Sequence, residues 1–247
     1  MRGPLLVAAL WLALAPGEAS AQSAALGLYS EGNDLYRRGE FAAARTRYLA
    51  AAGTGVRDAR LFYNLGNACF KDGRLGEAVV WYERARRLAP RDEDVLANLR
   101  FLRRVKRDRE EEGDGGFLYR LYLCPTLNEL FAALSLSLAG LCAAAGWRLV
   151  RGPGAAAVVA LGLCLGGILG SGAFAGTRLY QEVTLSEAVV TAADGQARSG
   201  PDPGQTPVFV VHEGTKVTVE RREGEWVLVR LANGLGGWLP GELLTVI

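Results

Sequence analysis

Two stretches of the chain decide its fold: GNDLYRRGEFAAARTRYLAA at residues 32–51 and GNACFKDGRLGEAVVWYERA at residues 66–85. They lie 34 positions apart, and six positions are identical in that register: Gly32/Gly66, Asn33/Asn67, Gly39/Gly73, Ala44/Ala78, Tyr48/Tyr82 and Ala51/Ala85. Self-similarity at a fixed period of this length predicts stacked helix pairs that bury their apolar faces against one another. The sequence therefore predicts an α-solenoid in the first half of the chain.

The order of residues within each unit resembles the tetratricopeptide repeat. Gly66 is the small residue, Gly73 the turn glycine and Pro90 the closing proline of that pattern. After Pro90, Asp92-Glu93-Asp94 opens a further helix, because acidic residues favour a helix N-terminus. We expect a tetratricopeptide repeat domain with a capping helix at residues 22–110, followed by a charged linker at residues 111–126.

The first helices of such repeats line a concave groove, and two pairs of asparagines occupy equivalent positions there: Asn33 with Asn67, and Asn64 with Asn98. A side-chain amide donates and accepts hydrogen bonds, so an asparagine ladder can bind the backbone of an extended peptide. The alternative is that these asparagines bond locally and fix the helix pair. Capture of a C-terminal carboxylate is not expected, because Tyr29 replaces the basic residue of the carboxylate-clamp subfamily and Asp94 also departs from it.

Arginines are dense between Arg84 and Arg109, with acidic residues among them. This pattern favours a solvated helix face, and the alternative is a face that contacts lipid or a partner.

Short alternating strands begin at about residue 183. The segments PVFVV, KVTVE and EWVLVRL are separated by glycine-containing turns, and Asn233-Gly234 is typical of a hairpin turn. ARSGP, EGTKVTV, EWVLVR and GWL follow in an order that resembles the bacterial SH3 domain, which implies a small β-barrel at residues 183–247. Trp226 and Trp238 are the candidates for aromatic contact with a ligand, although Trp238 is better explained by packing inside the barrel.

The N-terminus has the pattern of a secretory signal peptide. Arg2 precedes an apolar run, and Ala19-Ser20-Ala21 forms a small-x-small cleavage site. We expect a cleaved signal peptide at residues 1–21, with an uncleaved anchor as the alternative.

Residues 127–177 are predicted to form a two-span transmembrane hairpin. Uncharged runs at residues 130–147 and 155–177 reach about 27 and 34 Å at 1.5 Å per residue. We expect the spans to pack through two stripes of small residues, with a partner's helix as the alternative: Gly162, Gly166 and Gly170 against Ser135, Ala139 and Ala143. Arg148 and Arg151 mark the short loop as cytoplasmic by the positive-inside rule, which predicts an inner-membrane protein with both flanking domains on the periplasmic side.

Composition excludes several functions. With 28 Lys+Arg against 26 Asp+Glu, the formal charge of +2 gives no basic excess for binding nucleic acid. The single histidine, His212, excludes a two-histidine metal site, and Cys69 falls in the helix core, so no Cys–His pair is expected. We therefore expect no enzymatic activity, catalytic residue, metal or cofactor.

The order of these modules is similar to that of BatE-type proteins of the Bacteroides aerotolerance operon, and Asn128-Glu129-Leu130 before the first span also resembles that family. The resemblance implies an adaptor or scaffold in an envelope complex. Its expected partners are membrane proteins with von Willebrand A domains and a MoxR-type ATPase. The alternative is a cell-wall-associated protein that binds peptidoglycan peptide or assists a hydrolase.

Overall fold

The computed structural model describes residues 15–105, 125–152, 154–184 and 186–247. These residues form two compact units, one made of helical repeats and C-terminal strands and the other of two long apolar helices. The fold class is therefore confirmed. The predicted signal peptide and linker lie largely outside the described residues, and both stay predictions.

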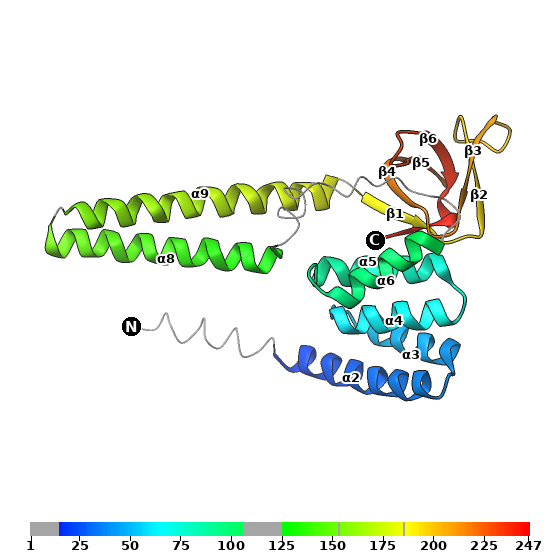
Figure 1. Ribbon diagram of the computed structural model, residues 1–247, viewed down its shortest axis with the longest axis horizontal. Helices are drawn as coiled ribbons and strands as arrows, with labels where there is room; N and C mark the ends of the chain where they lie inside the picture. The colour runs from blue at the N-terminus through cyan, green and yellow to red at the C-terminus, as the bar shows by residue number, and fades with distance from the viewer. Residues whose placement is uncertain (1–14, 106–124, 153, 185) are drawn as a thin grey trace. The chain divides into compact units, whose positions relative to one another are not determined.

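Among the described residues, five helices build the repeats: α2 (Ala15–Arg37), α3 (Phe41–Gly53), α4 (Ala59–Lys71), α5 (Leu75–Leu88) and α6 (Glu93–Val105). Figure 1 shows α2 beside α3 and α4 beside α5, as the period predicts. Gly39 and Gly73 adopt φ of 79° and 80° in the two turns, a left-handed conformation that glycine adopts without steric cost. Asp58 and Asp92, also 34 positions apart, accept backbone N–H bonds at the starts of α4 and α6.

The repeated register of small and aromatic residues is explained by packing within each helix pair. A Cβ on Gly32 would lie 2.5 Å from the Tyr48 ring, and one on Gly66 would lie 2.7 Å from the Tyr82 ring. Both rings are almost completely buried, with exposed fractions of 1% and 2%. The glycines are therefore the positions at which the first helix of each pair rests on the tyrosine of the second.

The C-terminal segment is one seven-stranded sheet with the order β3-β2-β6-β5-β4-β1-β7. Its elements are β1 (Ser186–Val190), β2 (Asp194–Arg198), β3 (Pro207–His212), β4 (Lys216–Glu223), β5 (Trp226–Arg230), β6 (Gly236–Pro240), the short helix η1 (Gly241–Leu243) and β7 (Leu244–Val246). The β1–β7, β2–β3, β4–β5 and β5–β6 ladders are antiparallel, which is consistent with the predicted SH3-like barrel. Its core is mostly valine: Val190, Val211, Val217, Val227 and Val229.

Within the part of the chain that the structure describes, two helices are long and apolar enough to cross a membrane: α8 (Leu127–Arg151) and α9 (Ala155–Thr184). They run side by side, as Figure 1 shows, and expose large apolar residues such as Leu136 and Leu163 at 74% and 73%. Such exposure is unfavourable in water and favourable in lipid. Glu129 of the Asn128-Glu129-Leu130 segment closes a capping box with Thr126 at the start of α8.

The contact between α8 and α9 does not use the predicted stripes. A Cβ on Gly167 would lie 2.5 Å from Ser137 Oγ, and one on Gly140 would lie 3.0 Å from Cys164 Sγ. By contrast, no described atom lies within 4 Å of a Cβ on Gly162, Gly166 or Gly170, and Ser135, Ala139 and Ala143 are exposed. The predicted packing face is therefore wrong. In helices this rich in small residues several rows share the four-residue spacing, so spacing alone does not select one.

Candidate functional site

The four groove asparagines belong to two equivalent chains of hydrogen bonds, one in each repeat. In the first repeat, Tyr48 donates to Asn33 Oδ1 over 2.8 Å, and Asn64 Nδ2 donates to the same oxygen over 3.2 Å. In the second, Tyr82 donates to Asn67 Oδ1 over 2.6 Å, and Asn98 Nδ2 donates to it over 3.1 Å. Each chain joins both helices of one repeat to the first helix of the next, so these bonds fix helix positions, as the local alternative expects.

Both tyrosine hydroxyls are protonated donors, and burial moves the pKa of each further from the physiological range. Desolvation raises the pKa of Tyr48 well above its usual value, and the nearby Tyr29 adds to the effect. Desolvation raises the pKa of Tyr82 in the same way, with a further contribution from Tyr63. Both hydroxyls therefore stay protonated throughout the physiological range and donate to the asparagine oxygens.

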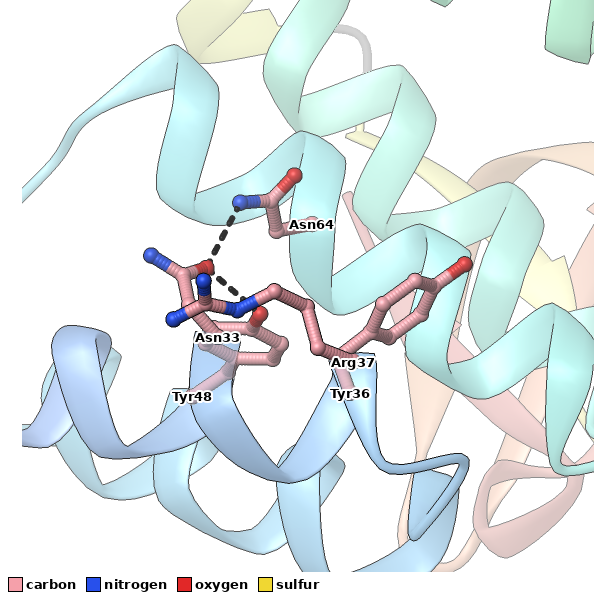
Figure 2. A pocket seen from close by; sticks show the side chains of 5 residues that line it. All are labelled: Asn33, Tyr36, Arg37, Tyr48 and Asn64. Atoms are coloured by element: carbon pink, nitrogen blue, oxygen red, sulfur yellow. Dashed lines mark hydrogen bonds between the residues drawn. The ribbon is translucent and has the colours of Figure 1, made fainter.

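A cavity of about 410 Å³ opens on the groove side of the first chain. Its lining residues are Asn33, Tyr36, Arg37, Tyr48 and Asn64. Figure 2 shows the side chain of Asn33 between those of Tyr48 and Asn64, with Arg37 beside them. Arg37 also pairs with Asp34, so its charge is partly neutralised by its own helix.

The hydrogen bonds leave part of each asparagine amide available. No described residue accepts a bond from Asn33 Nδ2 or donates one to Asn64 Oδ1. The same holds for Asn67 Nδ2 and Asn98 Oδ1 in the second chain. Each pair thus offers an N–H donor and a carbonyl acceptor, the two groups that complement a peptide unit. Peptide binding by these residues stays a prediction.

Tyr29, the residue that departs from the carboxylate-clamp pattern, accepts a hydrogen bond from Asn64 Nδ2 over 2.8 Å. Its ring lies 5.8 Å from that of Tyr48, and Tyr63 lies 5.9 Å from Tyr82 in the same arrangement. This tyrosine pair was not predicted, although Tyr29 and Tyr63 are also identical at the 34-residue offset. Tyr36 and Arg37 were not predicted either, although they follow Asn33 by three and four positions and so share its helix face.

The two tryptophans of the barrel are placed differently. Trp226 is half-buried at the start of β5, whereas Trp238 on β6 is only 6% exposed. The Arg221 guanidinium lies 5.2 Å from the centre of the Trp238 ring. Trp238 is therefore buried, but it alternates along β6 with the core residue Leu239 and is not part of the valine-rich core. Ligand contact by Trp226 or Trp238 stays a prediction.

Cys69 and His212 are the two residues considered for catalysis, and both have structural surroundings: Cys69 is buried in a helix core, and His212 lies beside Asp194. Cys69 is completely buried, and burial, with the charge of Glu77, raises the pKa of its thiol to about 12. A thiol with so high a pKa is a poor nucleophile. His212 lies on β3, where its Nε2 is 3.6 Å from Asp194 Oδ1.

Comparison with protein families agrees with the folds of the helical repeats and of the C-terminal sheet. Residues 29–93 match the tetratricopeptide repeat, and residues 194–245 match the bacterial SH3 domain. The chain is thus similar to these families over those segments. No curated protein matches the chain significantly. Tetratricopeptide repeats and bacterial SH3 domains point to interactions with proteins or with peptidoglycan.

Proposed function

We propose that the protein is a non-enzymatic adaptor of the bacterial envelope, anchored by α8 and α9, whose repeats bind an extended segment of a protein partner. The observation that carries the proposal is the cavity of about 410 Å³ beside the asparagine chain. It combines unpaired amide groups with the aromatic side chain of Tyr36 and the cation of Arg37. These are the groups that bind a peptide backbone and its side chains.

The hydrogen-bond chains suit this role because they orient the free groups in advance. Tyr48 and Asn64 hold the Asn33 oxygen, so its amide nitrogen has a fixed direction before a ligand arrives. Preorganisation lowers the entropy lost on binding. A second, equivalent set at Asn67 and Asn98 lies one repeat along, which suits a segment that spans both repeats.

The proposal includes the side of the membrane and the kind of partner. The signal-like N-terminus and the arginines Arg148 and Arg151 favour repeats and barrel on the extracytoplasmic side of the inner membrane. Arg151 also lies 4.8 Å from the ring of Trp147, a pairing suited to the membrane interface. The resemblance to BatE-type proteins directs the search for partners to membrane proteins with von Willebrand A domains and to a MoxR-type ATPase.

A second candidate function is attachment to the cell wall. It is supported by the bacterial SH3 match at residues 194–245 and by the half-buried ring of Trp226. In this case the barrel binds a peptidoglycan peptide, and the repeats serve as a spacer or bind a hydrolase.

In-cell crosslinking followed by detergent pull-down and mass spectrometry tests the proposal. We expect the wild type to recover membrane proteins, and Tyr36→Ala with Arg37→Ala to reduce their recovery several-fold. Arg38→Ala is the matched control, because Arg38 neighbours Arg37 but does not line the cavity. Equal recovery by the cavity variant and its control contradicts groove binding. Recovery of wall fragments alone, lost in Trp226→Ala, supports the second candidate instead.

A further inference from the structure

Helix α5 has a buried face that its own repeat does not require. Gly76, Val80 and Glu83 are all buried, although Ala42 and Thr46, which precede Gly76 and Val80 by one repeat, are exposed. Gly76, Val80 and Glu83 are spaced by four and three positions, so they lie on one side of the helix. Another part of the protein must therefore cover this side of α5 in the second repeat, whereas the equivalent side of α3 in the first repeat is left uncovered.

The C-terminal barrel covers it. The backbone N–H of Gly76 donates to Glu213 Oε1 over 2.8 Å, which places a carboxylate at the N-terminus of α5. A Cβ on Gly76 would lie 2.7 Å from the carbonyl oxygen of Val190, so only glycine permits this approach. Val189 of β1 is fully buried and belongs to the core of the repeats.

Charged groups continue the contact along α5. Arg87 lies 3.1 Å from Glu187 Oε2, and Lys216 lies 2.9 Å from Glu187 Oε1. Arg84 and Arg87 also donate over 2.7 Å to the carbonyl oxygens of Val246 and Ile247. These arginines were expected on a solvated face, and the structure corrects this: they bind the barrel.

Glu83 is the most buried charge in this contact, with a side chain 3% exposed and an Arg86 nitrogen 2.7 Å away. Burial alone would raise its pKa, but the charges of Lys216 and Arg86 outweigh burial and lower it. Lys216 comes from the barrel, so a carboxylate of the repeats is held ionised by a cation of the other domain. Arg86 of α5 and Lys216 of the barrel together compensate the burial of this charge.

We propose that the repeats and the barrel fold as one body, with the apolar pair α8–α9 as an insertion within it. The barrel occupies the α5 side of the second repeat. The groove asparagines lie on α2, α4 and α6, so docking leaves the groove available. Since both flanks of the apolar pair belong to one body, both must lie on the same side of the membrane, and the segment between them must cross it an even number of times.

Site-specific proteolysis of the full chain in detergent tests this proposal. A protease site with its own flexible flanks is inserted after Glu112, and an affinity tag follows Ile247. After cleavage, we expect the repeats to stay on the affinity column with the barrel, although no peptide bond joins them. Release of the wild-type repeats overturns the proposal.

Two variants show that retention depends on the docking contact. Gly76→Leu should reduce retention by about tenfold or more, because its side chain meets the β1 backbone. Leucine is also a better helix former than glycine, so α5 itself is not weakened. Ala42→Leu, at the equivalent exposed position, should retain the repeats fully. Glu213→Ala should reduce retention more than Glu225→Ala, which removes an exposed carboxylate from the turn between β4 and β5. Equal retention by both members of both pairs overturns the proposal.

Discussion

Removing one hydroxyl from each repeat should destabilise the two repeats by different amounts. The Tyr82 hydroxyl takes part in two hydrogen bonds, to Asn67 over 2.6 Å and from Asn98 over 3.2 Å. The Tyr48 hydroxyl has one such bond, to Asn33. At about 0.5–1.5 kcal/mol net for each bond, Tyr82→Phe should cost about 1–3 kcal/mol and Tyr48→Phe about half as much.

Neither substitution opens a cavity, because the ring stays in place on Gly66 or Gly32. Neither leaves an asparagine oxygen without a donor, because Asn98 still bonds to Asn67 and Asn64 still bonds to Asn33. The difference between the variants therefore reports the second bond of Tyr82. Without this second bond, the two variants would be equivalent.

Hydrogen exchange of the full chain in detergent, read by mass spectrometry, measures the free energy of local opening. We expect Tyr82→Phe to lower protection of peptides from α5 by a factor of roughly 5–150, the range that corresponds to about 1–3 kcal/mol. Peptides from α8 and α9 serve as the internal control. Equal losses in the two variants, or no loss in either, refute the reasoning.

Three further results are expected. Gly66→Ala should destabilise the repeats by about 1–3 kcal/mol in denaturant unfolding, because its Cβ meets the buried Tyr82 ring. Gly27→Ala should stabilise α2 slightly, since no neighbouring atom lies within 4 Å of a Cβ at that position. Equal effects of the two substitutions would contradict the packing of Gly66 on Tyr82. Below about pH 4 the cleaved repeats should separate from the barrel. The pKa of Glu83, which Lys216, Arg86 and Arg103 face, is lowered in the docked state, so docking is stable above that range and weakens as the carboxylate takes up a proton. Retention of the repeats that is unchanged down to pH 3 would count against this. Single cysteines can be introduced into a variant of the protein whose native cysteines are replaced. In spheroplasts, an impermeant maleimide should label Ser30→Cys and Gln205→Cys but reach Gly154→Cys only after permeabilisation. Labelling of only one of the two flanks would exclude their lying on the same side of the membrane.

The helix pairs could be predicted from the sequence because one register of 34 residues repeats the small and aromatic positions that must touch. The strands were predictable for a similar reason, since alternation and the turn at Asn233-Gly234 are local signals. The residues that form the α8–α9 contact could not be predicted, because many rows of small residues satisfy the same spacing. The contact between α5 and the barrel was not predicted either, because it joins residues 137 positions apart, such as Gly76 and Glu213. In hindsight its signal was Gly76, a glycine where the first repeat has alanine.

The candidate site was predicted in part. Asn33, Asn64, Asn67 and Asn98 are brought together as equivalent pairs, as the register requires. Their bonds to tyrosine hydroxyls were not foreseen, because a periodic pattern identifies which residues share a face but not which neighbouring ring completes the bond. Tyr36 and Arg37 are not identical at the 34-residue offset, where the second repeat has Phe70 and Lys71, so the repeated register does not single them out.

The separation of Gly76 from Glu213 also bears on the order of events during synthesis. A ribosome adds about 5–20 residues per second, so the partner of α5 emerges on the order of ten seconds after α5 itself. During that interval Val80 and Glu83 lack the β1 strand and the Lys216 ammonium that cover them in the finished molecule. The apolar pair is made within the same interval. A nascent chain that has not yet integrated both apolar helices therefore presents an open, apolar flank, which a chaperone can recognise as the mark of an unfinished protein.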